Sequence, residues 1–269
     1  MNFFITKADA STSLSKLSNR TLNAVTHEWY SVNFQETFIE NPIMITSIET
    51  YDGSDPSGVR IQALNKSGME VMIEEEESSD IEVKHASEIV SYFAVTEGLI
   101  RDVNDNIIGE AGKTTKDQSG SIWHVINTQK TYTNPVVFAQ MLTYNESHPS
   151  HMRLKNIQSD SFEMQIEEWD YLDGDHATED IGYIVLESGS HELAFGKKLE
   201  VGIITADHNW KSVNFDQNFN EIPMTISRCQ TYNDSHAVVT RQYNVKATDF
   251  SVKLQEAEGS DGTHMTESI

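Results

Sequence analysis

The stretch Phe162-Glu163-Met164-Gln165-Ile166-Glu167 decides the fold class of this chain. Apolar and polar residues alternate in it with a period of two, which is the pattern of an antiparallel strand with one buried and one solvated face. A similar alternation returns at residues 69–74 and 250–255. Three copies of one half-buried strand predict an all-β protein with internal repeats.

Single residues recur at fixed offsets around this strand. A tryptophan is followed after 12 or 13 residues by a proline, and a tyrosine, an arginine and a large apolar residue then follow at steps of nine. A His-x-Ser/Thr-Glu motif closes each set. The three sets are Trp29, Pro42, Tyr51, Arg60, Met69 and His85–Glu88; Trp123, Pro135, Tyr144, Arg153, Phe162 and His176–Glu179; and Trp210, Pro223, Tyr232, Arg241, Phe250 and His264–Glu267.

This spacing predicts three tandem antiparallel β-sandwich repeats, at residues 1–91, 92–182 and 183–269. Short strands separated by turns rich in Asn, Asp, Gly and Pro favour a sandwich. Residues 135–142 are apolar on both faces, which indicates a central strand. Residues 11–21 are expected to form a polar loop.

The repeats are expected to be circularly out of phase by one strand. An apolar strand follows the His motif at residues 91–95 and 182–186, whereas the third repeat reaches Ile269 before this strand. Phe3-Phe4-Ile5-Thr6 matches the missing closing strand in kind. Three ways to supply the closing strand of the third repeat are open. Residues 1–7 pair within the chain, they pair with a neighbouring chain, or the chain is a piece of a longer array.

Composition limits the classes of partner. With 42 acidic and 19 basic side chains the net charge is -23, which disfavours nucleic acid and anionic lipid. The sequence has no apolar run long enough for membrane insertion as a helix. Simple solubility, adaptation to high salt and binding of cations such as calcium are three open readings of the charge. The single Cys229 excludes intrachain disulfides and is expected to be buried.

The order of Trp123, Pro135-Val136-Val137, Arg153, Phe162 and Tyr183, with Glu187-Ser188-Gly189 opening the next unit, resembles the H-type lectin domain. The resemblance covers nearly the full length of each repeat. It implies a six-stranded antiparallel β-sandwich, binding of N-acetylgalactosamine-type sugars and association in trimers. The chain departs from the family where the sugar-contacting aromatic and His would lie, since this position reads Glu76-Glu77, Trp169-Asp170 and Ala257-Glu258. The fold expectation therefore carries over, but the sugar specificity does not.

The recurrent polar residues are the candidate ligand-binding residues, together with one tryptophan of the second repeat. They are His85, Glu88, Arg60, His176, Glu179, Arg153, Trp169, His264, Glu267 and Arg241. Two roles are open for them: a ligand site around each His, or structural Glu–Arg ion pairs with the His capping a turn. Asp173 and Asp175 are candidate metal ligands, because calcium prefers hard oxygen donors.

We expect a non-catalytic protein. No Gly-x-Ser-x-Gly elbow is present, Cys229 lies outside the repeated set, and multiplying a weak site gives avidity instead of rate. The prediction is an extracellular or cell-surface module that resembles H-type lectins and binds glycans multivalently or mediates adhesion, although residues 1–7 carry no signal-peptide pattern. The alternative is a structural subunit of an extracellular filament, matrix or virion, in which copies form a homo-oligomer or filament by exchanging β-strands.

Overall fold

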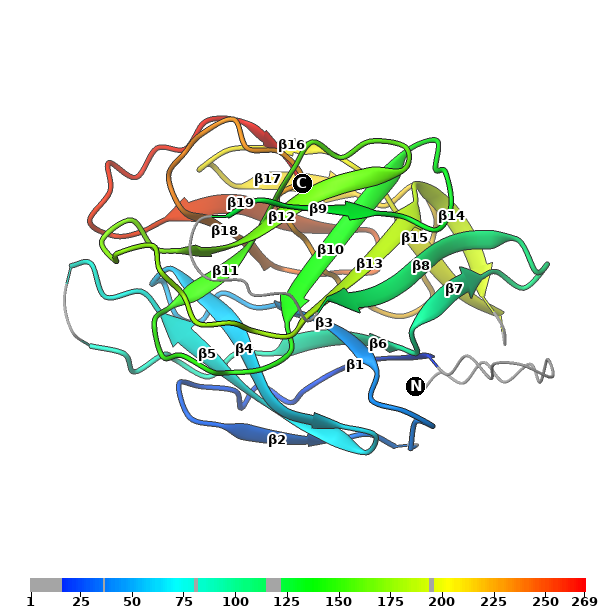
Figure 1. Ribbon diagram of the computed structural model, residues 1–269, viewed down its shortest axis with the longest axis horizontal. Helices are drawn as coiled ribbons and strands as arrows, with labels where there is room; N and C mark the ends of the chain where they lie inside the picture. The colour runs from blue at the N-terminus through cyan, green and yellow to red at the C-terminus, as the bar shows by residue number, and fades with distance from the viewer. Residues whose placement is uncertain (1–15, 36, 80–81, 115–121, 194–195) are drawn as a thin grey trace.

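The computed structural model describes residues 16–35, 37–79, 82–114, 122–193 and 196–269, and within them the chain is all-β (Figure 1). The predicted all-β class is confirmed. These residues form seven small antiparallel sheets and no α-helix. We describe the chain as segment I (residues 16–95), segment II (98–187) and segment III (189–269).

Two glycines begin the second and third segments. Gly98 has a φ of 123° and Gly189 a φ of 137°, values that glycine adopts without the steric cost of a Cβ. The chain can therefore turn sharply as it leaves one segment for the next. Residues 1–7, for which a closing strand was predicted, lie outside the described residues.

Segment I forms two three-stranded sheets, in the orders β1-β6-β3 and β2-β5-β4. The strands are β1 Lys16–Arg20, β2 Tyr30–Asn33, β3 Ile43–Ile48, β4 Ser57–Asn65, β5 Gly68–Glu75 and β6 Val90–Val95. The expected polar loop at residues 11–21 was wrong for its second half. There β1 pairs with β6 along its whole length, and backbone pairing with an apolar neighbour needs no apolar residues of its own.

Segment II has the same order of sheets, extended by one edge strand. Its strands are β7 Gly98–Arg101, β8 Ile107–Thr114, β9 His124–Asn127, β10 Pro135–Met141, β11 Ser150–Lys155, β12 Ser161–Glu168 and β13 Ile181–Glu187. They form the sheets β10-β13-β8-β7 and β11-β12-β9. The central position that β6 takes in segment I belongs to β13 here.

Segment III is less regular. Its strands are β14 Gly189–Leu193, β15 Lys197–Val201, β16 Thr205–Ala206, β17 Lys211–Asn214, β18 Val238–Tyr243, β19 Asp249–Glu256 and β20 Glu267–Ser268. One three-stranded sheet, β17-β19-β18, matches those of the other segments. The second sheet is reduced to the short pairs β16-β20 and β14-β15.

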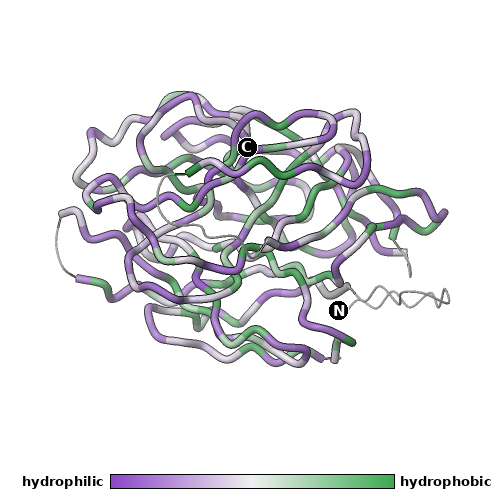
Figure 2. Tube along the Cα trace, in the orientation of Figure 1, coloured by the Kyte–Doolittle hydropathy of each residue, from purple (hydrophilic) through white to green (hydrophobic). Residues whose placement is uncertain are grey.

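The strand that opened the sequence analysis is present as β12, with its alternating apolar residues in the core. Phe162, Met164 and Ile166 are at most 2% exposed, and the side chains along the strands alternate in hydropathy (Figure 2). The opposite face is not solvated as the pattern predicted, since Gln165 and Glu167 are also buried. Glu167 on that face contacts the buried Arg153 of the neighbouring strand.

Residues 135–142 were expected to form a central strand of a sheet. This was wrong, because the strand lies at an edge of its sheet. β10 is the first strand of its sheet and pairs only with β13, although it is buried. The side-chain amide of Gln230 bonds to its free edge: Val137 N donates to Oε1 at 2.8 Å and Nε2 donates to Val137 O at 2.8 Å. A side chain of segment III thus occupies the backbone of Val137 on this edge.

One apolar core connects the three segments. It includes Ile45 of β3, Val136 of β10 and Ile184 of β13, together with Leu193 and Val201 of segment III. Two further clusters lie within segments II and III. Cys229 is buried as expected, and burial raises the pKa of its thiol to about 12.

Candidate functional site

The three recurrent arginines are buried between segments. Arg60 on β4, Arg153 on β11 and Arg241 on β18 are all 0% exposed. Each reaches the recurrent glutamate of another segment. The guanidinium-to-carboxylate distances are 3.2 Å for Arg60–Glu179, 3.8 Å for Arg153–Glu267 and 3.5 Å for Arg241–Glu88. Segment I thus contacts II, II contacts III, and III contacts I, which closes a ring.

Each arginine also has a partner on the neighbouring strand of its own segment. Arg60 Nη1 lies 2.7 Å from Glu74 Oε2, and Arg153 Nε lies 3.1 Å from Glu167 Oε2. At the third position Arg241 Nη1 donates to the amide oxygen of Gln255 at 3.0 Å. These partners are the buried polar face of the half-buried strand. Their position explains why that face is not solvated.

An aromatic ring from the other segment covers each guanidinium. The distances from the arginine Cζ to the ring centroid are 4.6 Å for Arg60–Tyr144, 4.8 Å for Arg153–Tyr232 and 4.7 Å for Arg241–Tyr51. Each tyrosine meets a recurrent tryptophan edge-on, in the pairs Trp29–Tyr144, Trp123–Tyr232 and Trp210–Tyr51. The tryptophan and tyrosine of the repeat therefore pack between segments, where cation–π contact adds to the ion pair.

The recurrent glutamate is held in its charged form. Burial opposes ionisation of Glu88, but hydrogen bonds from His85, Thr50 and the backbone of Gly53 and Asp52 outweigh it and lower the pKa. The pKa values of Glu179 and Glu267 are lowered in the same way. A buried carboxylate that stays ionised is the partner that a buried arginine requires.

The recurrent histidine joins two carboxylates. His85 Nδ1 contacts Glu75, and its Nε2 lies 3.3 Å from Glu88 Oε1. Burial opposes the charged imidazolium, but the hydrogen bonds to Glu75 and Glu88 raise the pKa of His85 above its usual value. His176 and His264 bridge equivalent pairs, Glu168 with Glu179 and Glu256 with Glu267.

The structure therefore brings together the sequence-predicted His, Glu and Arg residues, with the arginine coming from a different segment. Trp169 does not join them: it is 2% exposed and packs with Ala237, Val239 and Ala257 of segment III. Asp173 and Asp175 are exposed, and Asp173 accepts a hydrogen bond from the backbone of Asp175.

Two further members of each cluster were not singled out from the sequence. Glu75, Glu168 and Glu256 each lie 15 residues after the recurrent arginine, and a threonine stands directly before each recurrent tyrosine. Thr50, Thr143 and Thr231 donate hydrogen bonds to the recurrent glutamates. Their constant offsets were the available signal.

This arrangement pairs its charges with one another, not with solvent. The arginines and the recurrent glutamates are 0% exposed, so a glycan would reach them only after the segments separate. The ion pairs and hydrogen bonds of these clusters can hold the three segments together.

Comparison with known proteins gives one partial relative. The chain is 32% identical over 169 residues to Halomucin of Haloquadratum walsbyi, a match that covers 58% of this chain. The chain spans only 2% of the length of that protein. No protein-family model matches the chain, and no solved structure matches it. Among the described residues, no helix is long and apolar enough to cross a membrane.

Removing one arginine should destabilise the protein strongly. In Arg60→Met, Glu74 and Glu179 lose their buried countercharge, and we expect a loss of about 3–5 kcal/mol in the free energy of unfolding. Urea unfolding followed by tryptophan fluorescence measures it. Arg101→Met is the matched control, because Arg101 is 39% exposed and its ion pair with Asp105 should contribute less than about 1 kcal/mol. Equal losses in the two variants would contradict the structural role.

The cluster of His85 and Glu88 should give stability a defined pH window. The pKa of His85 is raised above 6.5, so its contribution is complete below pH 6.5 and is lost as the pH rises through the folded-state pKa. The pKa of Glu88 is lowered from 4.5, so its contribution is present above pH 4.5 and is lost as the pH falls through the folded-state pKa. Thermal unfolding across pH 4 to 9 should show the alkaline decline flattened in His85→Gln. Parallel profiles for the two proteins would refute this assignment.

Proposed function

We propose that this chain is a structural module of an extracellular assembly, built from three tandem β-sandwich units and joined to neighbouring copies by strand addition. The partial similarity to halomucin, a large extracellular protein, supports the location. The buried ring of ion pairs favours a structural role over a ligand-binding role. We place the unit boundaries after β6 and β13, because each of these strands pairs on both sides within its own segment.

The observation that carries the proposal is an incomplete sheet in segment III. β6 lies between β1 and β3, and β13 between β8 and β10. In segment III, β20 occupies the start of the equivalent central position. Ile269 exchanges two backbone hydrogen bonds with Ile204, at 2.8 and 3.0 Å. Beyond it, within the described part of the chain, residues 224–229 pair with no strand, although the matching residues of β3 and β10 do.

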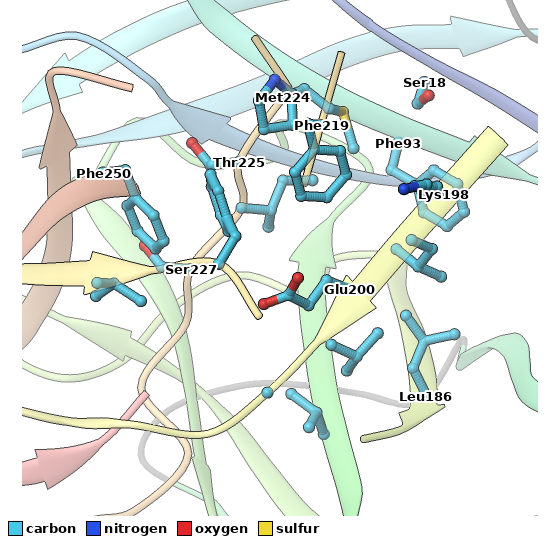
Figure 3. A pocket seen from close by; sticks show the side chains of 18 of the residues that line it. Ser18, Phe93, Leu186, Lys198, Glu200, Phe219, Met224, Thr225, Ser227 and Phe250 are labelled. Atoms are coloured by element: carbon cyan, nitrogen blue, oxygen red, sulfur yellow. The ribbon is translucent and has the colours of Figure 1, made fainter. Parts of the chain in front are cut away.

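An apolar groove takes the place of the central strand. It is a cavity of about 650 Å³ between residues 197–204 on one side and 221–228 on the other (Figure 3). Phe219, Met224 and Phe250 line it, together with the charged side chains of Glu200 and Lys198. Among the described residues, β15 pairs with β14 alone and residues 224–229 belong to no strand, so the two backbone segments that flank the apolar hollow form an acceptor for an extended strand.

The aromatic residues of the groove indicate what the added strand supplies. In segment I, Tyr92 of β6 lies 6.3 Å from Phe34, which pairs edge-on with Phe38. In segment III the matching Phe215 and Phe219 pair in the same way, with centroids 5.1 Å apart, and both line the groove. A strand with an aromatic residue at the position of Tyr92 would complete the cluster.

Phe3-Phe4-Ile5-Thr6 of a neighbouring copy is the occupant that we propose. Its first residue matches Tyr92, and Phe4 and Ile5 are apolar like Phe93 and Ala94. Main-chain hydrogen bonds would supply affinity, and alternate side chains would fill the groove.

Deleting residues 1–7 tests the assembly. We expect light scattering to show concentration-dependent oligomers for the intact chain and monomers for the deletion variant. Ile226→Arg, which places a charge in the groove, should also give monomers, whereas Ile122→Arg, at a residue that is 54% exposed elsewhere, should not. The proposal fails if the truncated chain assembles as well as the intact one, or if residues 1–7 crosslink only within a monomer.

Carbohydrate binding is the second candidate function, in keeping with the resemblance to H-type lectins. It rests on an exposed aromatic pair: Trp210 and Tyr243 are each 37% exposed, and their ring centroids lie 4.4 Å apart. Exposed aromatic faces are the surfaces on which sugar rings stack.

A glycan array probed at several calcium concentrations tests this second function. We expect binding that Trp210→Ala reduces at least tenfold and that Val103→Ala, at another exposed apolar residue, leaves unchanged. Silence across all glycans at every calcium concentration would reject it.

A further inference from the structure

Four side chains that can bind a metal converge in segment II, and one of them is the recurrent histidine, His176. Glu146 and His148 lie in the turn between β10 and β11, Glu168 ends β12, and His176 lies in the loop before β13. One atom of each of Glu146, His148 and Glu168 lies within 4.8 Å of the others. His176 Nδ1 points at the same carboxylates, 3.2 Å from Glu168 Oε1 and 3.7 Å from Glu146 Oε2.

The same four positions form a second cluster in segment III. Asp234 and His236 lie in the turn before β18, Glu256 ends β19, and His264 lies before β20. One ligand atom of each of Asp234, Glu256 and His264 lies within 4.8 Å of the others. His236 Nδ1 lies 3.3 Å from Asp234 Oδ1 and 3.8 Å from Glu256 Oε1. Two histidines and two carboxylates thus converge twice in one chain.

We propose that these two clusters bind a divalent transition-metal cation, with zinc as the best match. Nitrogen and oxygen bonds of 2.0–2.2 Å in a tetrahedral zinc site place neighbouring ligand atoms about 3.4 Å apart. In segment II the four nitrogen-to-oxygen distances are 3.0, 3.2, 3.5 and 3.7 Å. In segment III they are 2.6, 3.3, 3.8 and 4.0 Å. These distances lie around the required value, with Glu146 and Asp234 each presenting one carboxylate oxygen to one histidine and the other oxygen to the second histidine.

The surroundings of the histidines have the form of a second coordination shell. The remaining ring nitrogen of His176 lies 3.4 Å from Glu179 Oε1, and that of His264 lies 3.5 Å from Glu267 Oε1. Both glutamates are 0% exposed. A carboxylate on the second ring nitrogen orients a metal-binding histidine and increases its basicity.

One oxygen of a ligand carboxylate is buried without a partner. Among the described residues, Glu256 Oε2 has no hydrogen-bond partner, although its side chain is only 1% exposed. Such a group is costly unless a cation or water satisfies it. His148 and His236 are 40% and 53% exposed, so an ion could enter from solvent.

Segment I supplies an internal comparison. Its matching residues are Gly53, Asp55, Glu75 and His85, so one carboxylate is missing and one histidine is replaced. A Cβ at Gly53 would lie 2.5 Å from His85 Cε1, which shows that the imidazole ring fills the space of the missing side chain. Segment I is therefore expected to bind no metal, and the chain should bind two ions.

Calorimetry on the full chain tests the inference, after removal of metal with a chelator. In 1 M NaCl with excess Mg²⁺, which suppress binding to the acidic surface, we expect two zinc ions per chain. His148→Ala and His236→Ala should each reduce this to one, and the double variant to none. Asp55→Ala, the matched change in segment I, should leave two.

A second readout guards against misfolding of a variant. Zinc should raise the thermal midpoint of the wild type and of Asp55→Ala, but not that of the double variant, whose circular dichroism without metal should equal that of the wild type. Zinc binding that survives in the double variant, or a wild type that binds no zinc under these conditions, would overturn the inference. Neither result bears on strand addition, because the groove shares none of these residues.

Discussion

The structure depends on a buried guanidinium whose charge is balanced by a carboxylate from another segment. A charge taken out of water costs several kcal/mol unless its partner and hydrogen bonds are held in place. Here the carboxylate is kept ionised by a histidine, a threonine and backbone N–H groups, and a tyrosine ring covers the guanidinium. Each segment gives an arginine to one neighbour and a glutamate to the other. An isolated segment would have neither contact.

This constraint explains the polar residues of the half-buried strands. Glu74, Glu167 and Gln255 are on the face that a simple period-two pattern assigns to solvent, yet each contacts a buried arginine. The next residue along each strand is a glutamate that contacts the recurrent histidine. The two faces of each strand end therefore serve different purposes: a residue on one face contacts the arginine that joins the segments, and the next residue, on the opposite face, holds the histidine.

Segment III differs from the others in its central strand and not in its ion pairs. Arg241, Glu267 and His264 make the same contacts as their counterparts, so the joint between segments is complete. In the second sheet, in contrast, residues 267–269 are the part of the described chain that fills the central position. Since the recurrent Glu267 lies at the start of this central position, in β20, the ring of ion pairs closes without the rest of that position.

The sequence by itself determined the strands and the membership of the clusters. Period-two alternation and constant offsets are local properties, and they predicted β5, β12 and β19 and placed Arg, His and Glu in one recurrent set. Residues such as Glu75 and Thr50 recur as regularly and could have been included. The sequence did not determine which segment supplies each partner. Arg60 and Glu179 are 119 residues apart, and no local pattern encodes a contact across that distance. Only the tertiary structure decided that the arginine crosses to another segment, because that choice depends on how the three segments pack around one core.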